Sequence, residues 1–171
     1  MANGTVNGSG GMRMEGRDSA HLIAGKYMYI NKHWYPDGKV KKIEYMRPGG
    51  DCDSVCCNEH EITYDTTGRI ISDLNFNQGK FDSAQILYYY KADANAMFKK
   101  YMGYKNGIET GKRIEWYGNN KRVEGQYVGG KEEGTWRYYK NNKEYAENIF
   151  KNGKAVNLKE IDTISIEKSN H

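Results

Sequence analysis

Apolar and polar side chains alternate along most of the chain from residue 26 onward. The alternation runs in segments of about 6 to 9 residues, which is a common strand length. A period of two is the period of a β-strand, because successive side chains point to opposite faces of a sheet. We find no sustained period of 3.6 residues. The pattern therefore predicts a series of short strands.

One kind of turn between these segments follows a pair of aromatic residues. Its dipeptides, such as Asp-Gly and Asn-Asn, tolerate the positive φ angles of tight hairpins. The clear copies are Trp34–Lys39, Trp116–Lys121 and Tyr138–Lys143, and the weaker copies are Tyr64–Arg69 and Tyr89–Ala94.

A second kind of turn follows a single aromatic residue. Its copies are Phe76–Lys80, Tyr104–Gly107, Tyr127–Lys131 and Phe150–Lys154, with a degenerate member at Tyr45–Gly50. Gly107, Gly130 and Gly153 are spaced by 23 residues. A fixed period of this size indicates a repeat protein in which each unit packs only on its neighbours. We therefore predict an all-β fold, an elongated single-layer antiparallel meander of about five tandem hairpins.

The repeats divide the chain into three parts. Residues 1–25 are rich in Gly, Asn and Ser and are interpreted as a disordered leader or a cloning remnant. Residues 26–156 form the repeat domain, and 157–171 form a polar tail in which Leu158–Ile166 alternates enough to add a final strand. Within residues 82–103, Asp93–Tyr101 also suits a short helix, but strand–turn–strand is preferred.

The alternation also assigns side chains to faces. We place Ile114, Trp116, Val123 and Tyr127 on one face of the sheet. In the last two hairpins, Trp136 and Tyr138 are expected on the equivalent face. The segment from Lys143 to Gly153 is one residue longer than its counterpart, which indicates a β-bulge.

Composition and charge narrow the function classes. The net charge is +4, with both signs interspersed, and 15 tyrosines supply much of the apolar surface. Nucleic-acid or membrane binding calls for a basic block, which this chain lacks. No transmembrane segment or signal-peptide core is present, so we expect a soluble protein.

The three cysteines, Cys52, Cys56 and Cys57, lie close together and near His60. This spacing matches no standard zinc site, so the cluster is a weak metal candidate. The preferred interpretation is a longer loop whose thiols are free or locally paired. An odd number of cysteines favours a reducing compartment, and we expect a cytoplasmic location.

No nucleophile and base are paired in the sequence, and no phosphate-binding loop is present. We therefore expect no catalytic residues, no cofactor and no enzyme activity. Tyr, Trp and Arg dominate the energetics of protein interfaces, whereas any single aromatic is more often a packing residue. The candidate partner-binding residues are Trp116, Tyr117, Trp136, Arg137, Tyr138 and Tyr139.

Residues 104–154 resemble the MORN-repeat-variant family. The resemblance rests on Tyr104-Lys105-Asn106-Gly107 with Gly111, on Tyr127 through Gly134, and on Gly134-Thr135-Trp136-Arg137-Tyr138-Tyr139. It weakens over residues 26–103. The resemblance implies a β-repeat sheet without a catalytic centre. Many bacterial members resemble YwqK-like antitoxin or immunity proteins, which neutralise a toxin by binding it.

Three functional hypotheses follow. The first is a protein-binding module, most simply an antitoxin or immunity protein of a bacterial toxin–antitoxin system. The second is a structural or membrane-peripheral scaffold built on the same repeats. The third is a small metal-dependent enzyme centred on Cys52 to His60.

Overall fold

The chain folds into strands alone in the part that the computed structural model describes, which comprises residues 21–23, 26–47, 58–90 and 97–160. The strands are β1 (His21–Ile23), β2 (Lys26–Trp34), β3 (Val40–Met46), β4 (Asn58–Tyr64), β5 (Ile70–Asn77), β6 (Lys80–Tyr88), β7 (Met97–Lys105), β8 (Ile108–Tyr117), β9 (Lys121–Val128), β10 (Lys131–Lys140), β11 (Lys143–Lys151) and β12 (Lys154–Glu160).

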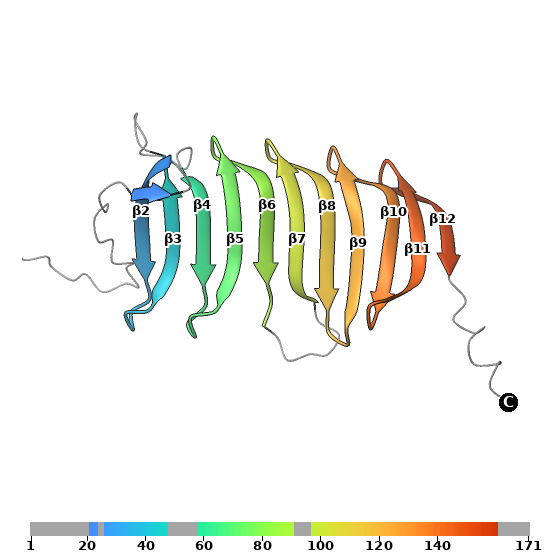
Figure 1. Cartoon of the computed structure of the whole chain (residues 1–171), viewed down its shortest axis with the longest axis horizontal. Helices are drawn as coiled ribbons and strands as arrows, with labels where there is room; N and C mark the ends of the chain where they lie inside the picture. The colour runs from blue at the N-terminus through green and yellow to red at the C-terminus, as the bar shows by residue number, and fades with distance from the viewer. Residues whose placement is uncertain (1–20, 24–25, 48–57, 91–96, 161–171) are drawn as a thin grey trace, which may run out of the picture.

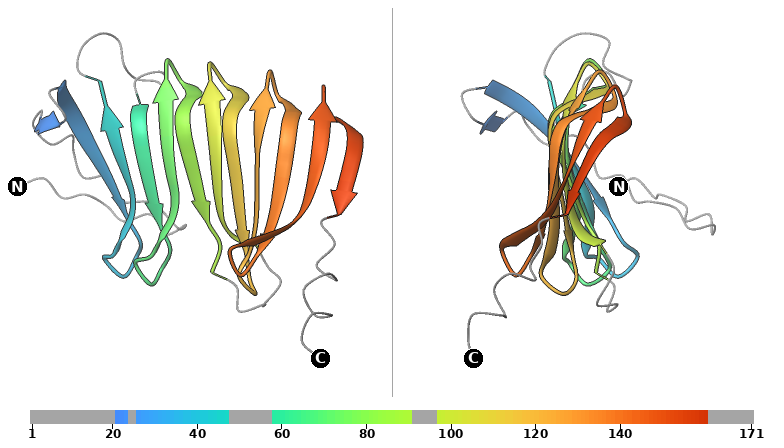
Figure 2. Two further views of the ribbon diagram at one scale, coloured as in Figure 1. Left: turned by 45° about the vertical axis from the view of Figure 1, so that its right-hand side comes forward. Right: turned by 90° about the vertical axis from the view of Figure 1, so that its right-hand side faces the viewer.

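The strands lie side by side in chain order, and each pairs antiparallel with the next (Figure 1). β2 to β12 form one open, twisted layer, and the short β1 pairs with the start of β2 (Figure 2). The turns of the first kind close five hairpins, from β2–β3 to β10–β11. The predicted single-layer meander is therefore confirmed.

The two kinds of turn lie at opposite ends of the strands (Figure 1). Asn119, Asn120, Asn141 and Asn142 all adopt positive φ, the conformation that the asparagine-rich turns predict. At the other end, successive turns are joined by backbone hydrogen bonds. The N–H of Gly130 donates to the carbonyl of Glu109 (2.9 Å), and the N–H of Gly153 donates to that of Glu132 (3.0 Å).

Both partners of these two bonds are displaced by the same 23 residues, so the sequence repeat is also a repeat of contacts. The N–H of Gly107 likewise donates to the carbonyl of Phe81 (2.7 Å). Each turn therefore stacks directly on the preceding one. This contact fixes the spacing of neighbouring hairpins independently of their side chains.

The sheet has two chemically different faces, because side chains of directly paired residues lie on the same face. We call one the network face. Its central row, from β3 to β11, is Glu44, Glu61, Leu74, Gln85, Met102, Arg113, Gly125, Trp136 and Asn148. Four side chains of this row are almost inaccessible, namely Gln85 (1% exposed), Met102 (7%), Trp136 (7%) and Arg113 (8%).

We call the other the isoleucine face. Its central row, from β2 to β11, is Lys32, Ile43, Ile62, Asp73, Ile86, Tyr101, Ile114, Glu124, Arg137 and Glu147. The row is apolar over most of β3 to β8 and charged over β9 to β11. Its four isoleucines stay half-buried, and no second layer of described residues covers them (Figure 2).

The predicted distribution of side chains between faces is wrong at the β8–β9 turn. Glu115 pairs with Val123, and Gly111 pairs with Tyr127. Val123 and Tyr127 therefore lie on the network face, opposite to Ile114 and Trp116. The cause is the three-residue turn of Gly118–Asn120, which pairs odd-numbered residues with odd-numbered ones. A turn with an even number of residues would have given the predicted arrangement.

The other local predictions have mixed outcomes. Tyr145 is the extra residue of the predicted bulge, since Tyr138 pairs with Ala146 and Tyr139 pairs with Glu144. Met97–Tyr101 is strand, as preferred over helix.

His21–Ile23 forms β1, so the predicted leader is wrong for these three residues. The final strand exists, but it begins at Lys154 and not at Leu158. Residues 48–57, 91–96 and 161–171 lie outside the described part.

Gln85 replaces a stretch of backbone pairing between β5 and β6. Its side-chain amide accepts a hydrogen bond from the N–H of Asn75 (2.9 Å) and donates to the carbonyls of Asn75 (2.7 Å) and Asp82 (2.9 Å). The strand register shifts at this point. A fully buried amide is tolerated here because its donor and acceptor atoms are all paired.

Gly125 provides the space in which the indole of Trp136 lies. A Cβ atom at residue 125 would stand 2.2 Å from Cδ2 of Trp136. We expect Gly125→Ala to lower the free energy of unfolding by about 1–3 kcal/mol, the usual cost of overpacking. Urea denaturation measures this change. In a Trp136→Leu background the same substitution should cost less, and an equal cost in both backgrounds would contradict the steric explanation.

Candidate binding faces

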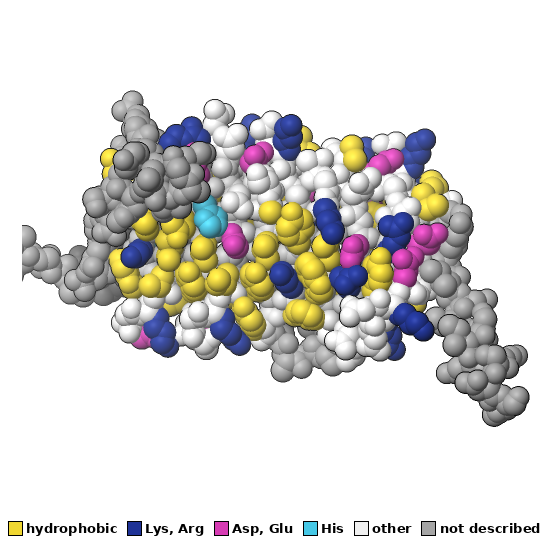
Figure 3. Space-filling view, viewed as in Figure 1, with side chains coloured by type: hydrophobic (Ala, Val, Ile, Leu, Met, Phe, Trp, Pro, Cys, Tyr) yellow, Lys and Arg dark blue, Asp and Glu magenta, His cyan; other side chains and the backbone are white. Residues whose placement is uncertain are grey.

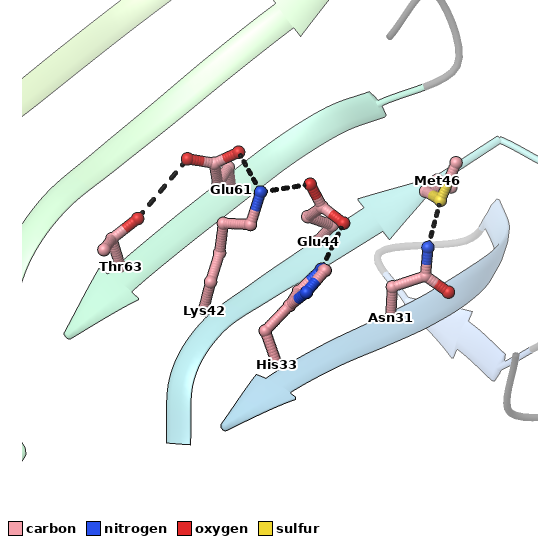
Figure 4. A network of polar contacts seen from close by, with 7 residues as sticks. All are labelled: Asn31, His33, Lys42, Glu44, Met46, Glu61 and Thr63. Atoms are coloured by element: carbon pink, nitrogen blue, oxygen red, sulfur yellow. Dashed lines mark hydrogen bonds and ion pairs between the residues drawn. The ribbon is translucent and has the colours of Figure 1, made fainter. Parts of the chain in front are cut away.

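The network face carries a chain of polar contacts across β2, β3 and β4 (Figure 4). Nε2 of His33 lies 2.8 Å from Oε2 of Glu44, and Nζ of Lys42 lies 2.5 Å from Oε1 of the same glutamate. Lys42 also reaches Glu61 (3.4 Å), which accepts a hydrogen bond from Thr63 (3.3 Å). Every charged group in this chain has an opposite charge beside it.

A second polar cluster surrounds Arg113 on the same face. Its guanidinium donates to Glu115 (2.6 Å) and to Glu109, and the hydroxyl of Tyr117 donates to Glu115 as well. Lys100 lies 3.6 Å from Glu115. The arrangement neutralises Arg113.

The pKa values in this cluster follow from burial and pairing. Burial would raise the pKa of the Glu115 carboxyl, but hydrogen bonds from Tyr117 and Arg113 outweigh it, and the pKa is held below its ordinary value. Burial, together with the hydrogen bond to Glu115, raises the pKa of Tyr117 to about 12. At neutral pH the cluster therefore holds an ionised Glu115 and a protonated Tyr117.

Aromatic rings follow the cluster toward the second-kind turns. Phe76, Phe81 and Tyr104 are in sequential contact, with ring centroids 5.2 and 5.3 Å apart. Tyr127, Trp136 and Phe150 form a second run, with centroids 5.6 and 5.8 Å apart. The guanidinium of Arg113 lies over Tyr127 at 5.4 Å. These rings supply the network face with packing of its own.

The isoleucine face presents an apolar band that runs from Ile43 to Ile114. Figure 3 shows the band, together with one histidine beside an acidic side chain. On this face, Nε2 of His60 lies 2.7 Å from Oδ1 of Asp73, and both side chains are partly exposed. The ring of His60 also stacks on Tyr45, with centroids 5.2 Å apart. At this end of the band, Asp73 stands between Ile62 and Ile86 in the central row.

A ladder of alternating rings and cations borders the band near the first-kind turns. Tyr88, Lys99, Trp116, Arg122 and Tyr139 follow one another on adjacent strands. Nζ of Lys99 lies 5.4 Å from the ring centroid of Tyr88 and 5.0 Å from that of Trp116. Arg122 lies 4.4 Å from the centroid of Tyr139. We call these five residues the cation–aromatic ladder.

The six candidate partner-binding residues fall on both faces. Trp116, Arg137 and Tyr139 lie on the isoleucine face, whereas Tyr117, Trp136 and Tyr138 lie on the network face. Trp136 is buried against Gly125, and the hydroxyl of Tyr138 accepts a hydrogen bond from Asn148 (3.1 Å). The structure therefore brings together only half of the predicted set.

The weak metal candidate is only partly visible, because Cys52, Cys56 and Cys57 lie outside the described residues. Among the residues with described positions, no group of three or more His, Cys, Asp or Glu side chains is arranged to hold a metal ion. The same part of the chain contains no helix that is long and apolar enough to span a bilayer.

The structure adds residues that were not selected from the sequence. The isoleucines and Lys99 matter because they lie in register across adjacent strands, and register is not visible in any single strand. The sequence did contain information on this register, because the length of each turn determines which residues pair across a hairpin.

Comparison with known proteins does not assign the chain to a family. No protein-family model matches the sequence, and a search of curated proteins finds no match.

The Arg113 cluster predicts a dependence of stability on pH. The folded-state pKa of the Glu115 carboxyl is lowered. Its contribution to the free energy of unfolding is therefore fully present above the ordinary glutamate pKa of about 4.5, and it is lost as the pH falls below that pKa. Glu115→Gln should therefore be less stable than the wild type at pH 7, and the difference should shrink at lower pH. Urea denaturation across this range measures it. Glu144→Gln is the reference outside the cluster, and parallel profiles for Glu115→Gln and the wild type would contradict the expectation.

Proposed function

We propose that this chain is a non-catalytic protein-binding module, and that it acts as an antitoxin or immunity protein by binding a partner toxin directly. The observation that carries the proposal is the apolar band of the isoleucine face. Ile43, Ile62, Ile86 and Ile114 lie in one row and are half-exposed. Soluble proteins rarely expose a contiguous apolar surface of this kind unless it meets another molecule.

The chemistry of the described residues agrees with binding. The charged groups of the His33–Glu61 chain and of the Arg113 cluster are paired with one another. The isoleucine face combines an apolar centre with an aromatic and cationic border, which is the composition of many protein interfaces. An open, extended sheet suits recognition of a folded surface. The antitoxin role itself comes from the MORN-like sequence.

Co-expression with the product of the adjacent gene tests the role. The proposal expects that this chain suppresses growth inhibition by the neighbouring protein and co-elutes with it on size exclusion. A neighbour that is neither toxic nor bound would contradict the antitoxin role.

The binding face is tested by Ile86→Lys and Ile114→Lys. Ile86 pairs with Asp73, and Ile114 pairs with Glu124, so each introduced lysine has a carboxylate opposite it and the sheet is preserved. Each substitution should weaken partner binding by about 2 kcal/mol or more, the loss expected at the centre of an interface. Calorimetric titration with the partner measures this loss.

Val128→Lys is the matched control, because Val128 is 56% exposed beside the β9–β10 turn and outside the band. It should bind the partner as the wild type does. Circular dichroism must show the same sheet content in all three variants. Unchanged affinity in both isoleucine variants would exclude the isoleucine face as the binding surface.

A further inference from the structure

The cation–aromatic ladder ends in an open pocket of about 390 Å³ beside the β8–β9 and β10–β11 turns. Its lining includes the aromatic residues Phe98, Trp116 and Tyr117 and the polar residues Lys121, Arg122 and Asn142. We call it the turn pocket. It lies at the first-kind-turn end of the sheet, where Tyr117 and Lys121 come from the network face. Trp116 and Arg122 belong both to its lining and to the ladder, so one bound molecule can contact both.

The turn pocket has an excess of positive charge. Lys99 and Lys121 form no ion pair with any described residue. Nε of Arg122 lies 2.6 Å from Oε1 of Glu124 but is not aligned for a hydrogen bond, and Glu124 is shared with Lys112 (3.8 Å). The local charge therefore differs from that of the network face, where carboxylates surround each cation.

The rings hold the cations in place. The ammonium of Lys99 lies between Tyr88 and Trp116, and the guanidinium of Arg122 rests on Tyr139. A cation over a ring keeps its outward N–H groups free and loses part of its side-chain mobility before any ligand arrives. The site is therefore partly organised for a carboxylate, which binds such donors through charge-assisted hydrogen bonds.

We propose that the turn pocket and the cation–aromatic ladder bind an acidic segment of the partner protein. The inference rests on the proposed function, because it names the chemistry of the partner at the edge of the same face. Ile86 and Ile114 lie in the central row beside the ladder, so a protein surface with acidic residues beside apolar ones matches both. Single-stranded nucleic acid fits less well, because its bases would have to displace Lys99 and Arg122 from the rings on which bases stack.

Fluorescence anisotropy with a labelled oligoglutamate peptide tests the proposal without a known partner. The wild type should bind oligoglutamate, should bind it more weakly as salt is raised, and should not bind an oligolysine peptide of the same length. The double variant Lys121→Gln/Arg122→Gln should bind it about tenfold more weakly, as expected for the loss of two charge-assisted contacts. Lys121→Gln alone, at an exposed position beside the turn, should cost about threefold and separates binding from folding.

Lys131→Gln/Lys154→Gln is the matched control. It removes the same charge from exposed positions at the second-kind turns, at the other end of the strands. This variant should bind oligoglutamate as the wild type does. An equal loss in both double variants would show general attraction to a basic protein and would overturn the proposal.

Three further results would also overturn it. They are the absence of oligoglutamate binding, unchanged binding in the Lys121→Gln/Arg122→Gln variant, and tight binding of oligothymidylate that oligoglutamate does not displace. The two proposals fail separately. Failure of the peptide to bind overturns the turn-pocket assignment even if a partner protein binds the isoleucine face. Unchanged partner binding in the isoleucine variants overturns the binding face, whatever the peptide does.

Discussion

Cross-strand pairing of side chains within one layer is the interaction on which this structure depends. The described strands have no second layer to pack against, so apolar surface is buried mainly by the neighbour on the adjacent strand. Aromatic contacts of the kind seen from Phe76 to Phe150 contribute about 0.5–1.5 kcal/mol each beyond their buried area. Whole domains are stable by only about 5–15 kcal/mol. A few such contacts are therefore a substantial share of what holds the sheet together.

This constraint separates the two faces in role. The network face buries Gln85, Met102, Arg113 and Trp136 and satisfies its charges internally. The isoleucine face packs its side chains less completely. The network face thus supplies most of the packing that a single layer needs. The isoleucine face keeps its side chains more accessible. Burial, more than residue type, distinguishes the two, since both carry aromatic residues and arginines.

The architecture was predictable from the sequence, because its signals are local. Asn-Gly and Asn-Asn turns, alternation within strands and a 23-residue spacing each depend on a few neighbouring residues, and together they specify a meander. The faces were not predictable in the same way. The odd-numbered turn at Gly118–Asn120 reverses the expected side of Val123 and Tyr127, and the bulge at Tyr145 changes the register again.

The candidate binding residues were also assigned without knowing on which face of the sheet each one lies. Trp136 and Tyr139 are close in sequence but lie on opposite faces, so a selection based on aromatic clusters mixed packing residues with exposed ones. Lys99 was overlooked because its significance comes from Tyr88 and Trp116, which belong to two other strands. Sequence proximity does not separate the two faces, whereas the strand register does.

The hydrogen bonds between successive turns have a consequence for how such a protein changes over evolutionary time. The N–H groups of Gly130 and Gly153 each bond to a carbonyl beside the preceding second-kind turn, so the same contact can recur each time a hairpin is added. Strands in a sheet lie about 4.8 Å apart, and one hairpin therefore lengthens the surface by about 10 Å. The length of the sheet can change in discrete steps while its turn chemistry stays the same, so the surface that one scaffold presents can differ in length.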